Sequence, residues 1–290
     1  MERQVRRMYV ILRRKHIAAA LCSALALVLV PLGLAQLPGE HVSASKAANT
    51  NWGLSFQKEG EPPVGNASAD YLKQYGAYYL GDTSKKTIYL TFDAGYENGY
   101  TPAILDALKK HNVKATFFVV GDWVDKYPES VKALHDAGHE VMNHSLHHDH
   151  YNALTADQVV ADVTACNEKI AAITGVTPCL IRCPYGEYDD HVISAIRSMG
   201  MEPIQWDVDS LDWKDYDADT ICQRVTSKLS PGSIVLFHNA ALHTPEALPA
   251  ILDHMAREGY SLLPISQLIY RENYTIDHAG RQFCQAQSEQ

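Results

Sequence analysis

The chain has 290 residues, of which 46% are hydrophobic, so it can bury a large core. Its formal net charge of -9 argues against nucleic acid as a partner, because proteins that bind phosphate backbones carry a basic face. We therefore expect one main globular domain that does not bind nucleic acid.

The N-terminal residues depart from this acidic balance. Residues 1–16 are rich in arginine, which predicts a basic cytoplasmic segment, and residues 17–37 are an apolar run without charge. The run is long enough to span a bilayer, which predicts an exported protein attached to the membrane or secreted to the cell wall. Small residues follow the run, so a cleaved signal peptide competes with an uncleaved anchor, and the length of the run favours the anchor. A buried hairpin of a soluble domain is the remaining alternative.

The rest of the chain divides into three parts by composition. Residues 38–85 are rich in Gly, Pro, Ala, Ser and Asn and contain four tyrosines, which predicts a linker and an extension that packs on the domain. Residues 86–271 alternate apolar runs with helical patterns and form the expected domain. Residues 272–290 are predicted to be a polar tail.

Seven short apolar or β-branched runs mark the expected strands of the domain. They are TIYLTFD at 87–93, ATFFVV at 115–120, EVMNH at 140–144, CLIRCP at 179–184, EPIQWD at 202–207, SIVLFH at 233–238 and SLLPI at 261–265. Strands that alternate with helices are typical of an α/β fold with parallel strands and crossover helices. About seven such units favour a distorted (β/α) barrel with outer helices, and a doubly wound sheet is the alternative.

Six cysteines in an exported chain suggest disulfides, but Cys22 lies in the apolar run and leaves an odd five. Cys179 and Cys183 lie on one face of an expected strand, too far apart along it for a direct bridge. We therefore expect buried free thiols.

Polar residues fall at the ends of the expected strands. They are Asp93, His144, Arg182, Asp207, Asp209 and His238. In β/α barrels the carboxyl ends of the strands carry the active site, so these side chains are expected to face one cleft. This convergence favours a function for the stretch HSLHHDH at 144–150, which would otherwise be read as a polar loop.

Five motifs along the chain resemble those of the polysaccharide deacetylases, carbohydrate esterase family 4 with its NodB-homology domain. They are TFDAGY at 91–96, HSLHH at 144–148, RCPYG at 182–186, DSLDW at 209–213 and LFH at 236–238, and the resemblance covers about residues 86–270. NWG at 51–53, YLGDT at 79–83 and TFDAGYENGYT at 91–101 are most similar to the branch that deacetylates muramic acid for the muramic δ-lactam of spore cortex.

The resemblance implies an exported, metal-assisted hydrolase that removes N-acetyl groups from peptidoglycan glycan strands, with N-acetylmuramic acid as the expected target. N-acetylglucosamine or another acetylated glycan is an alternative substrate. A pseudoenzyme that only binds peptidoglycan and a histidine-rich protein that sequesters metal are alternatives of other classes.

Hydrolysis of an N-acetyl amide needs an activated water, a site for the oxyanion and an acid for the departing amine. Asp93 is the candidate base, and Arg182 could hold it ionised by pairing with it. His238 is the candidate acid, because an imidazolium titrates near the working pH. The resemblance assigns Asp212 as the carboxylate that orients His238, and Asp209 is the alternative.

The candidate metal ligands are His144 and His148, which a helical turn would bring together, and neutral imidazoles suit Zn²⁺. His147 and His150 compete for this role on spacing alone. The resemblance favours the first and fifth positions of the motif, so we expect His147 and His150 to be solvated.

The resemblance also assigns the oxyanion hole and the substrate groove. The backbone N–H of Tyr185 is the expected oxyanion donor, and its side chain is expected only to pack. Trp213 and Leu236 are expected to line the sugar groove and the acetyl pocket, beside Asp209, since apolar surfaces suit a pyranose ring and a methyl group. A place in the core is the alternative for both Trp213 and Leu236.

Ala94 is the position at which the chain departs from the family. Most members have a second aspartate there, which completes a site of one carboxylate and two histidines. A metal held by two imidazoles and water should bind weakly. The muramic-acid branch tolerates a non-acidic residue here, so Ala94 supports the branch and weakens the case for metal.

Overall fold

The computed structural model describes residues 54–55, 58, 61, 64–65, 76–96, 99–270, 274–277 and 281–284. Contacts divide the chain into residues 1–45 and 46–290, and the first unit lies outside the described residues, as do the expected basic segment and apolar run. In the part of the chain that is described, we find no helix that combines the length and the apolar character needed to cross a membrane.

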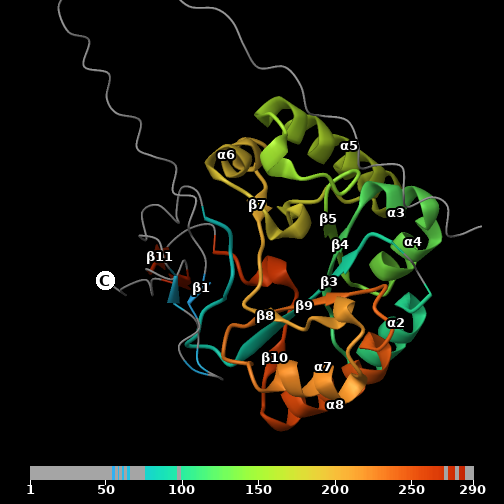
Figure 1. The fold of residues 1–290 in the computed structure, drawn as a ribbon, viewed down its shortest axis with the longest axis vertical. Coiled ribbons are helices and arrows are strands. Elements are labelled where there is room, and N and C mark those ends of the chain that lie inside the picture. The colour runs from blue at the N-terminus through green and yellow to red at the C-terminus, as the bar shows by residue number, and fades with distance from the viewer. Residues whose placement is uncertain are drawn as a thin grey trace, which may run out of the picture. The chain divides into compact units, whose positions relative to one another are not determined.

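The described part of the domain is built on seven parallel strands in the order β7-β6-β5-β4-β3-β9-β8. Their bounds are β3 Thr87–Ala94, β4 Thr116–Val119, β5 Glu140–Asn143, β6 Leu180–Ile181, β7 Glu202–Pro203, β8 Val208–Asp209 and β9 Ile234–His238. A further strand, β10 (Ser261–Leu262), runs parallel to the start of β3. Figure 1 shows β3, β4 and β9 at the centre of this sheet.

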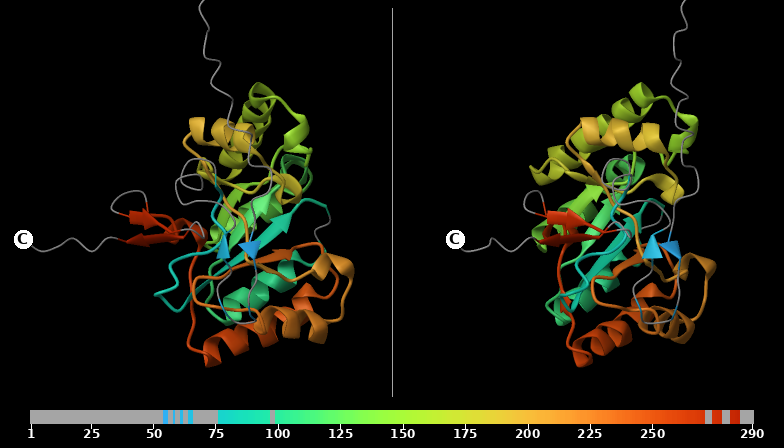
Figure 2. Two further views of the ribbon diagram at one scale, coloured as in Figure 1. Left: turned by 60° about the vertical axis from the view of Figure 1, so that its left-hand side comes forward. Right: turned by 90° about the vertical axis from the view of Figure 1, so that its left-hand side faces the viewer.

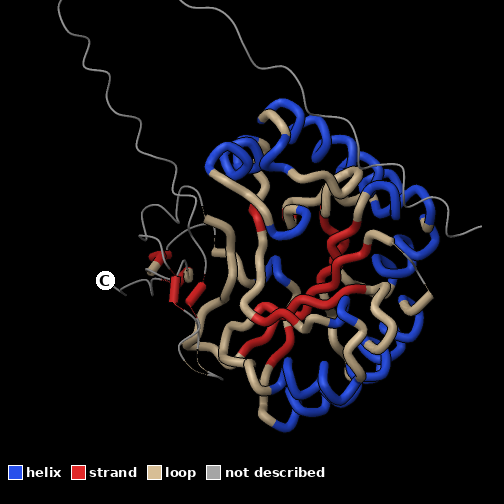
Figure 3. Tube along the Cα trace, viewed as in Figure 1, coloured by secondary structure: helices blue, strands red, loops and turns tan. Residues whose placement is uncertain are grey.

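Helices connect these strands and lie in an arc along the outer side of the sheet (Figures 2 and 3). They are α2 Thr101–Lys110, α3 Gly121–Lys126, α4 Pro128–Asp136, α5 Ala156–Thr174, α6 Asp190–Ser198, α7 Ala218–Thr226 and α8 Thr244–Arg257. The α/β class and the distorted (β/α) barrel expected from the alternation are thus confirmed, in the form of a curled half-barrel.

The two edge strands show how far the sheet curls. β7 and β8 stand at opposite ends of the strand order, yet only four residues lie between Pro203 and Val208. The five Cα–Cα steps from Pro203 to Val208 span at most about 18 Å when the chain is fully extended. The two edges must therefore approach each other, which brings the carboxyl ends of all the strands around one opening.

The residues of β3 alternate between two environments, as strand geometry requires. The Phe92 ring stacks on Phe117 at 4.8 Å and on Phe237 at 5.4 Å, within the core that the helices cover. Thr91 and Asp93 face the other way and both accept hydrogen bonds from Arg182. The core therefore fixes the strand that presents Asp93 to the opening.

The prediction that EPIQWD at 202–207 forms the fifth strand was wrong. EPIQWD forms the short β7 and then leaves the sheet, and a separate β8 carries Asp209 on the other edge. Asp207 lies near the start of β9, where its carboxylate accepts from the Ser233 hydroxyl and the Ile234 N–H, so it does not belong to the carboxyl-end opening. Burial raises the pKa of Asp207 to about 7.

One antiparallel strand pair precedes the domain in the chain, and another follows it. β1 (Leu54–Ser55) pairs with β2 (Val64–Gly65), and β11 (Tyr274–Ile276) pairs with β12 (Gln282–Cys284) within the expected polar tail. Gln282 is buried and bonds the backbone of Tyr270 and the hydroxyl of Tyr78, so this part of the tail is folded. Tyr78 also forms a parallel bridge with Ile204, which packs the end of the extension on the barrel.

The four cysteines whose side chains are described, Cys166, Cys179, Cys183 and Cys222, are free thiols. Cys179 and Cys183 do not share a face, because β6 ends at Ile181 and the chain turns there. Cys183 is buried with Tyr151 and Val159, whereas Cys179 packs against a different cluster.

Candidate active site

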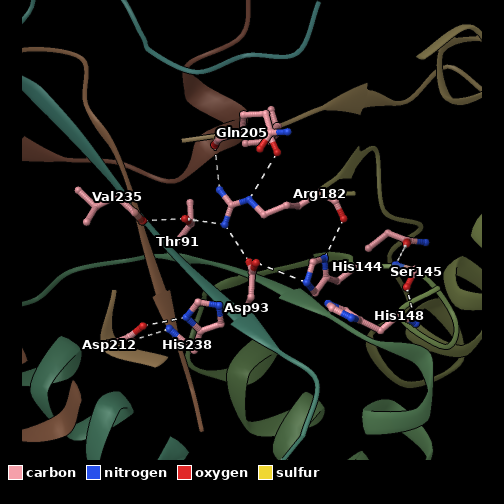
Figure 4. A network of polar contacts seen from close by, with 12 residues as sticks. Thr91, Asp93, His144, Ser145, His148, Arg182, Gln205, Asp212, Val235 and His238 are labelled. Carbon is pink, nitrogen blue, oxygen red and sulfur yellow. Dashed lines mark hydrogen bonds and ion pairs between the residues drawn. The ribbon is translucent and has the colours of Figure 1, made fainter. Parts of the chain in front are cut away.

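A pocket of about 560 Å³ opens at the carboxyl ends of the strands. It is lined by Asp93, Gly95, Tyr96, His144, His148, Tyr185, Gly186, Trp206, Asp209, Trp213, Asp215, Leu236, His238, Asn239, Ala240 and Ala241. Figure 4 shows side chains from β3, from β9 and from the segment that follows β5 turned toward one another there. The structure thus brings together most of the residues that the sequence selected.

Asp93 and Arg182 form a buried ion pair, with Arg182 Nη1 2.8 Å from Asp93 Oδ1. The guanidinium is wholly buried between the rings of Phe118 and Trp206 and also donates to the Gln205 carbonyl at 3.0 Å. Burial by itself would raise the pKa of Asp93, but the charge and hydrogen bond of Arg182, together with the nearby His144 and His238, hold it below its ordinary value. Asp93 is therefore an ionised carboxylate at neutral pH.

His144 lies beside this pair. Its Nδ1 is 2.8 Å from the Arg182 carbonyl oxygen, which can only accept, so this nitrogen carries the proton. The lone pair of Nε2 then faces the pocket, 3.4 Å from Asp93 Oδ2. Burial lowers the pKa of His144, which keeps the ring neutral and able to bind a cation.

His148 meets His144 through a tight loop. The expected helical turn was wrong, because the chain from His144 to His148 is non-helical and Ser145 and His148 adopt left-handed backbone angles, with φ of 73° and 62°. The Ser145 hydroxyl accepts from the His148 N–H at 2.8 Å and closes the loop, and the two rings lie 4.9 Å apart. Burial lowers the pKa of His148 to about 4.

The donor set fits a metal ion only in part. His148 Nδ1 is buried and has no hydrogen-bond partner among the described residues, as expected of a nitrogen that binds an ion. Ala94 offers no donor and packs in the apolar core. In the described ranges, no three His, Cys, Asp or Glu side chains converge as a metal site. The residues thus supply two ligands and lack a third.

The other two histidines of the stretch point away from this pair. His147 Nδ1 lies 2.9 Å from the Asp122 carboxylate of α3, and His150 Nδ1 lies 2.8 Å from Glu187. Both imidazoles are more than half exposed. The geometry therefore does not favour His147 or His150 as a metal ligand.

His238 is held by Asp212. Asp212 is fully buried, and its carboxylate accepts from Nδ1 and from the backbone N–H of His238, both at 2.8 Å, and from the Thr244 hydroxyl at 2.6 Å. Burial by itself would lower the pKa of His238, but the hydrogen bond and charge of Asp212, together with the charges of Asp93 and Asp209, outweigh it and the net shift is upward. Asp209 instead accepts from the Leu211 N–H at 2.8 Å, so the geometry selects Asp212.

Tyr185 stands on the opposite wall in a left-handed conformation, with φ of 58° and ψ of 4°. Its side chain is 53% exposed, and its ring packs against the His148 ring with the ring centres 4.5 Å apart. Trp213 is 55% exposed at the pocket, so it is not a core residue, whereas Leu236 is buried and contributes to the pocket floor.

Comparison with known proteins now identifies the family. A model of the polysaccharide deacetylase family matches residues 80–204. The peptidoglycan-N-acetylmuramic acid deacetylase PdaA of Bacillus subtilis (strain 168) is 36% identical over 231 residues, which cover 78% of this chain and 88% of PdaA. The chain belongs to the polysaccharide deacetylase family.

Solved structures of this family agree with the fold. The structure of Bacillus subtilis PdaA, a family 4 carbohydrate esterase, matches with a TM-score of 0.71 at 36% identity over 75% of this chain and 95% of that one. The Bacillus anthracis protein BA3943, described as a family 4 pseudoenzyme, matches with a TM-score of 0.64 at 36% identity over 66% of this chain and 68% of that one.

A second relative is named for N-acetylglucosamine and not for N-acetylmuramic acid. The peptidoglycan-N-acetylglucosamine deacetylase of Bacillus cereus is 36% identical over 169 residues, or 58% of this chain and 62% of the relative. Membership of the family therefore establishes a peptidoglycan deacetylase fold and activity class without fixing the sugar.

The sequence analysis missed two residues that line this pocket, Tyr96 and Trp206, and one buried residue that supports it, Thr244. Tyr96 is 64% exposed and faces the His148 ring, and it stands in the TFDAGY motif, which could have suggested it. Trp206 was assigned to the interior of a strand. Thr244 follows the last motif by six residues and gives no local signal of its contact with Asp212.

Proposed function

We propose that this deacetylase is an exported, metal-assisted hydrolase that removes the N-acetyl group of N-acetylmuramic acid in peptidoglycan strands, on the route to the muramic δ-lactam of spore cortex. The observation that carries the proposal is the convergence of the Asp93–Arg182 and His238–Asp212 pairs on one pocket. The choice of sugar is supported by PdaA, which the chain matches over 88% of its length. Export is supported by the substrate's place outside the cytoplasm and by the apolar run at 17–37.

Asp93 is the proposed general base. Its Oδ1 is held by Arg182, which leaves Oδ2 to accept a proton from the water that attacks the acetyl carbonyl. The buried guanidinium keeps the carboxylate ionised and fixed in direction, so little reorganisation is needed when the water reacts.

His238 is the proposed general acid. Asp212 binds Nδ1, so Nε2 is the nitrogen that is left to protonate the amine as the C–N bond breaks. The raised pKa keeps a larger fraction of His238 protonated at neutral pH. The backbone N–H of Tyr185, across the pocket, would donate to the oxyanion of the tetrahedral intermediate.

His144 and His148 would hold the divalent ion, for which Zn²⁺ is the natural candidate. When bound, the ion would polarise the acetyl carbonyl and lower the pKa of water. Trp213 would stack on the sugar ring, Leu236 would contact the acetyl methyl group, and Asp209 would accept from a sugar hydroxyl.

A pseudoenzyme that binds peptidoglycan without cleaving it is the second candidate. Ala94 removes a possible ligand, and the chain resembles BA3943, which is itself described as a pseudoenzyme. The retained Asp93, Arg182 and His238 favour catalysis.

The test is to incubate the full chain with purified peptidoglycan glycan strands, with chelator or with added zinc, and to locate lost acetyl groups by mass spectrometry. We expect metal-dependent loss at muramic acid. Loss only at glucosamine would contradict the sugar assignment. No loss with any metal, together with intact glycan binding, would favour the pseudoenzyme.

A further inference from the structure

The turn that carries the expected oxyanion donor is strained. Tyr185 has a φ of 58°, and Gly186 follows with a φ of 69°. A side chain is disfavoured in the left-handed region, so the surrounding structure must hold Tyr185 there. Two backbone hydrogen bonds close the turn, from the Gly186 N–H to the Cys183 carbonyl at 3.1 Å and from the Glu187 N–H to the Pro184 carbonyl at 3.0 Å. The Gly186 carbonyl also accepts from the Gln205 side-chain amide at 2.7 Å. None of these bonds holds the Tyr185 side chain.

A second contact holds the Tyr185 ring itself. The His150 imidazole stacks on it with the ring centres 4.2 Å apart and the planes 12° from parallel. His148 meets the same ring nearly at right angles, so the ring is fixed between the two histidines. His150 is in turn held by Glu187, two residues beyond Tyr185, with Nδ1 2.8 Å from Oε2.

We propose that His150 and Glu187 form a clamp that positions the backbone N–H of Tyr185 for the oxyanion, an inference that rests on the proposed function. Glu187 fixes the plane of the imidazole, the imidazole fixes the tyrosine ring, and the ring fixes the direction of the Tyr185 Cα–Cβ bond. The clamp joins the loop that carries His148 to the turn that carries the oxyanion donor. His150 and Glu187 are thus positioning residues and not ligands or catalytic groups.

The geometry argues against a simpler role for His150 as a sugar-binding surface. Its ring covers one face of Tyr185, so a sugar cannot stack on that face. His150 is also absent from the residues that line the pocket. A positioning role predicts a loss in kcat, because the oxyanion exists only in the transition state, whereas a binding surface predicts a rise in KM.

The kinetic test compares His150→Ala, His150→Phe and Glu187→Ala with wild type, at saturating zinc. Loss of one aromatic contact should lower kcat about five-fold with KM nearly unchanged, a size typical of stacked pairs. His150→Phe keeps the stack without the Glu187 bond and should recover most of the rate. Glu187→Ala should show a small loss of kcat.

His147→Ala is the matched control, because His147 lies in the same loop, is similarly exposed and pairs with Asp122 instead. It should keep the wild-type kcat and KM. A rise in KM without a change in kcat for His150→Ala would overturn the clamp, and so would an equal loss of kcat in His147→Ala.

A second measurement needs no turnover and therefore separates this inference from the proposed function. Amide hydrogen exchange of the peptide that contains residues 183–187, followed by mass spectrometry of the full chain, reports how firmly the turn is held. We expect faster exchange in His150→Ala and wild-type exchange in His147→Ala. Unchanged exchange in His150→Ala would contradict the clamp, whereas an inactive wild type with this exchange pattern would contradict only the proposed function.

Discussion

Two pocket residues carry pKa shifts of opposite sign. The pKa of Asp93 is lowered and that of His238 is raised above its ordinary value of 6.5. The proposed mechanism needs Asp93 ionised and His238 protonated, so kcat/KM should follow a bell with a broad plateau. The acid limb belongs to Asp93 and the basic limb to His238.

Asp212→Asn tests the assignment of the basic limb. The substitution removes a charge that raises the pKa of His238, so the limb should move to lower pH, with a lower kcat. The measurement is kcat/KM for acetate release across the pH range. A basic limb that does not move would show that His238 is not the acid.

Ala94→Asp tests the two-histidine site. Ala94 is fully buried, so a carboxylate there should destabilise the metal-free protein by roughly 1–3 kcal/mol, and an ion shared with His144 and His148 should reverse the loss. Thermal unfolding with and without zinc should therefore show a larger rise in Tm for the variant than for wild type. An equal rise in both proteins would mean that the added carboxylate does not reach the ion.

At the scale of elements, buried strands were predicted well and their connections were not. TIYLTFD is rich in β-branched and apolar residues because β3 is buried on both faces, and such runs are typical of central parallel strands. EPIQWD has a similar pattern, but the chain leaves the sheet after β7 in this run and crosses to β8 on the other edge. The local sequence does not distinguish a run that forms one strand from a run that connects two edges, because the curl of the whole sheet determines which of them forms.

The loop from His144 to His148 also could not be predicted from its local sequence. The spacing of His144 and His148 predicted their proximity through a helix, and the structure produces it through a loop. Contacts distant in sequence hold that loop, since Asp162 of α5 accepts from the Leu146 N–H at 2.9 Å and from the Tyr151 hydroxyl at 2.6 Å. These partners could not be read from the motif itself.

His139 links the starts of β4 and β5 and predicts a pH effect on stability. Its Nδ1 accepts from the Ala115 N–H at 3.1 Å, so the ring is neutral, and burial with the nearby charge of Lys114 lowers its pKa to about 4. On unfolding the pKa returns to about 6.5, so the unfolded chain binds more protons between these values. The stabilisation is complete above pH 6.5 and is lost as pH falls toward 4.

Urea unfolding of wild type and His139→Gln at pH 7 and pH 4.5 measures this effect. Wild type should lose about 2 kcal/mol of unfolding free energy from this group over the interval. Glutamine can still accept from Ala115 and does not titrate, so the variant should lose correspondingly less. Identical losses in both proteins would contradict the assignment.

For the whole molecule, the sequence predicted the barrel and the set of residues around its opening, because strand ends in such folds carry polar side chains. The family resemblance pointed to Asp212, but residue type and spacing alone left Asp209 nearly as plausible. Both lie at or just beyond the end of the same strand, and only the contacts of His238 distinguish them. The sequence analysis also treated His150 as solvated, because its contact with Tyr185 crosses two loops. Residue roles that depend on contacts between loops could be assigned only from the structure.

The central claim is that this chain is a peptidoglycan deacetylase that uses Asp93 as its base. The most direct test is acetate release from peptidoglycan glycan strands by the full chain and by Asp93→Asn, with circular dichroism to show that both are folded. We predict release by wild type and a loss of at least about 100-fold in the variant, with the fold unchanged. A variant that keeps the wild-type rate, or a wild type that binds the strands and releases no acetate, would contradict the claim.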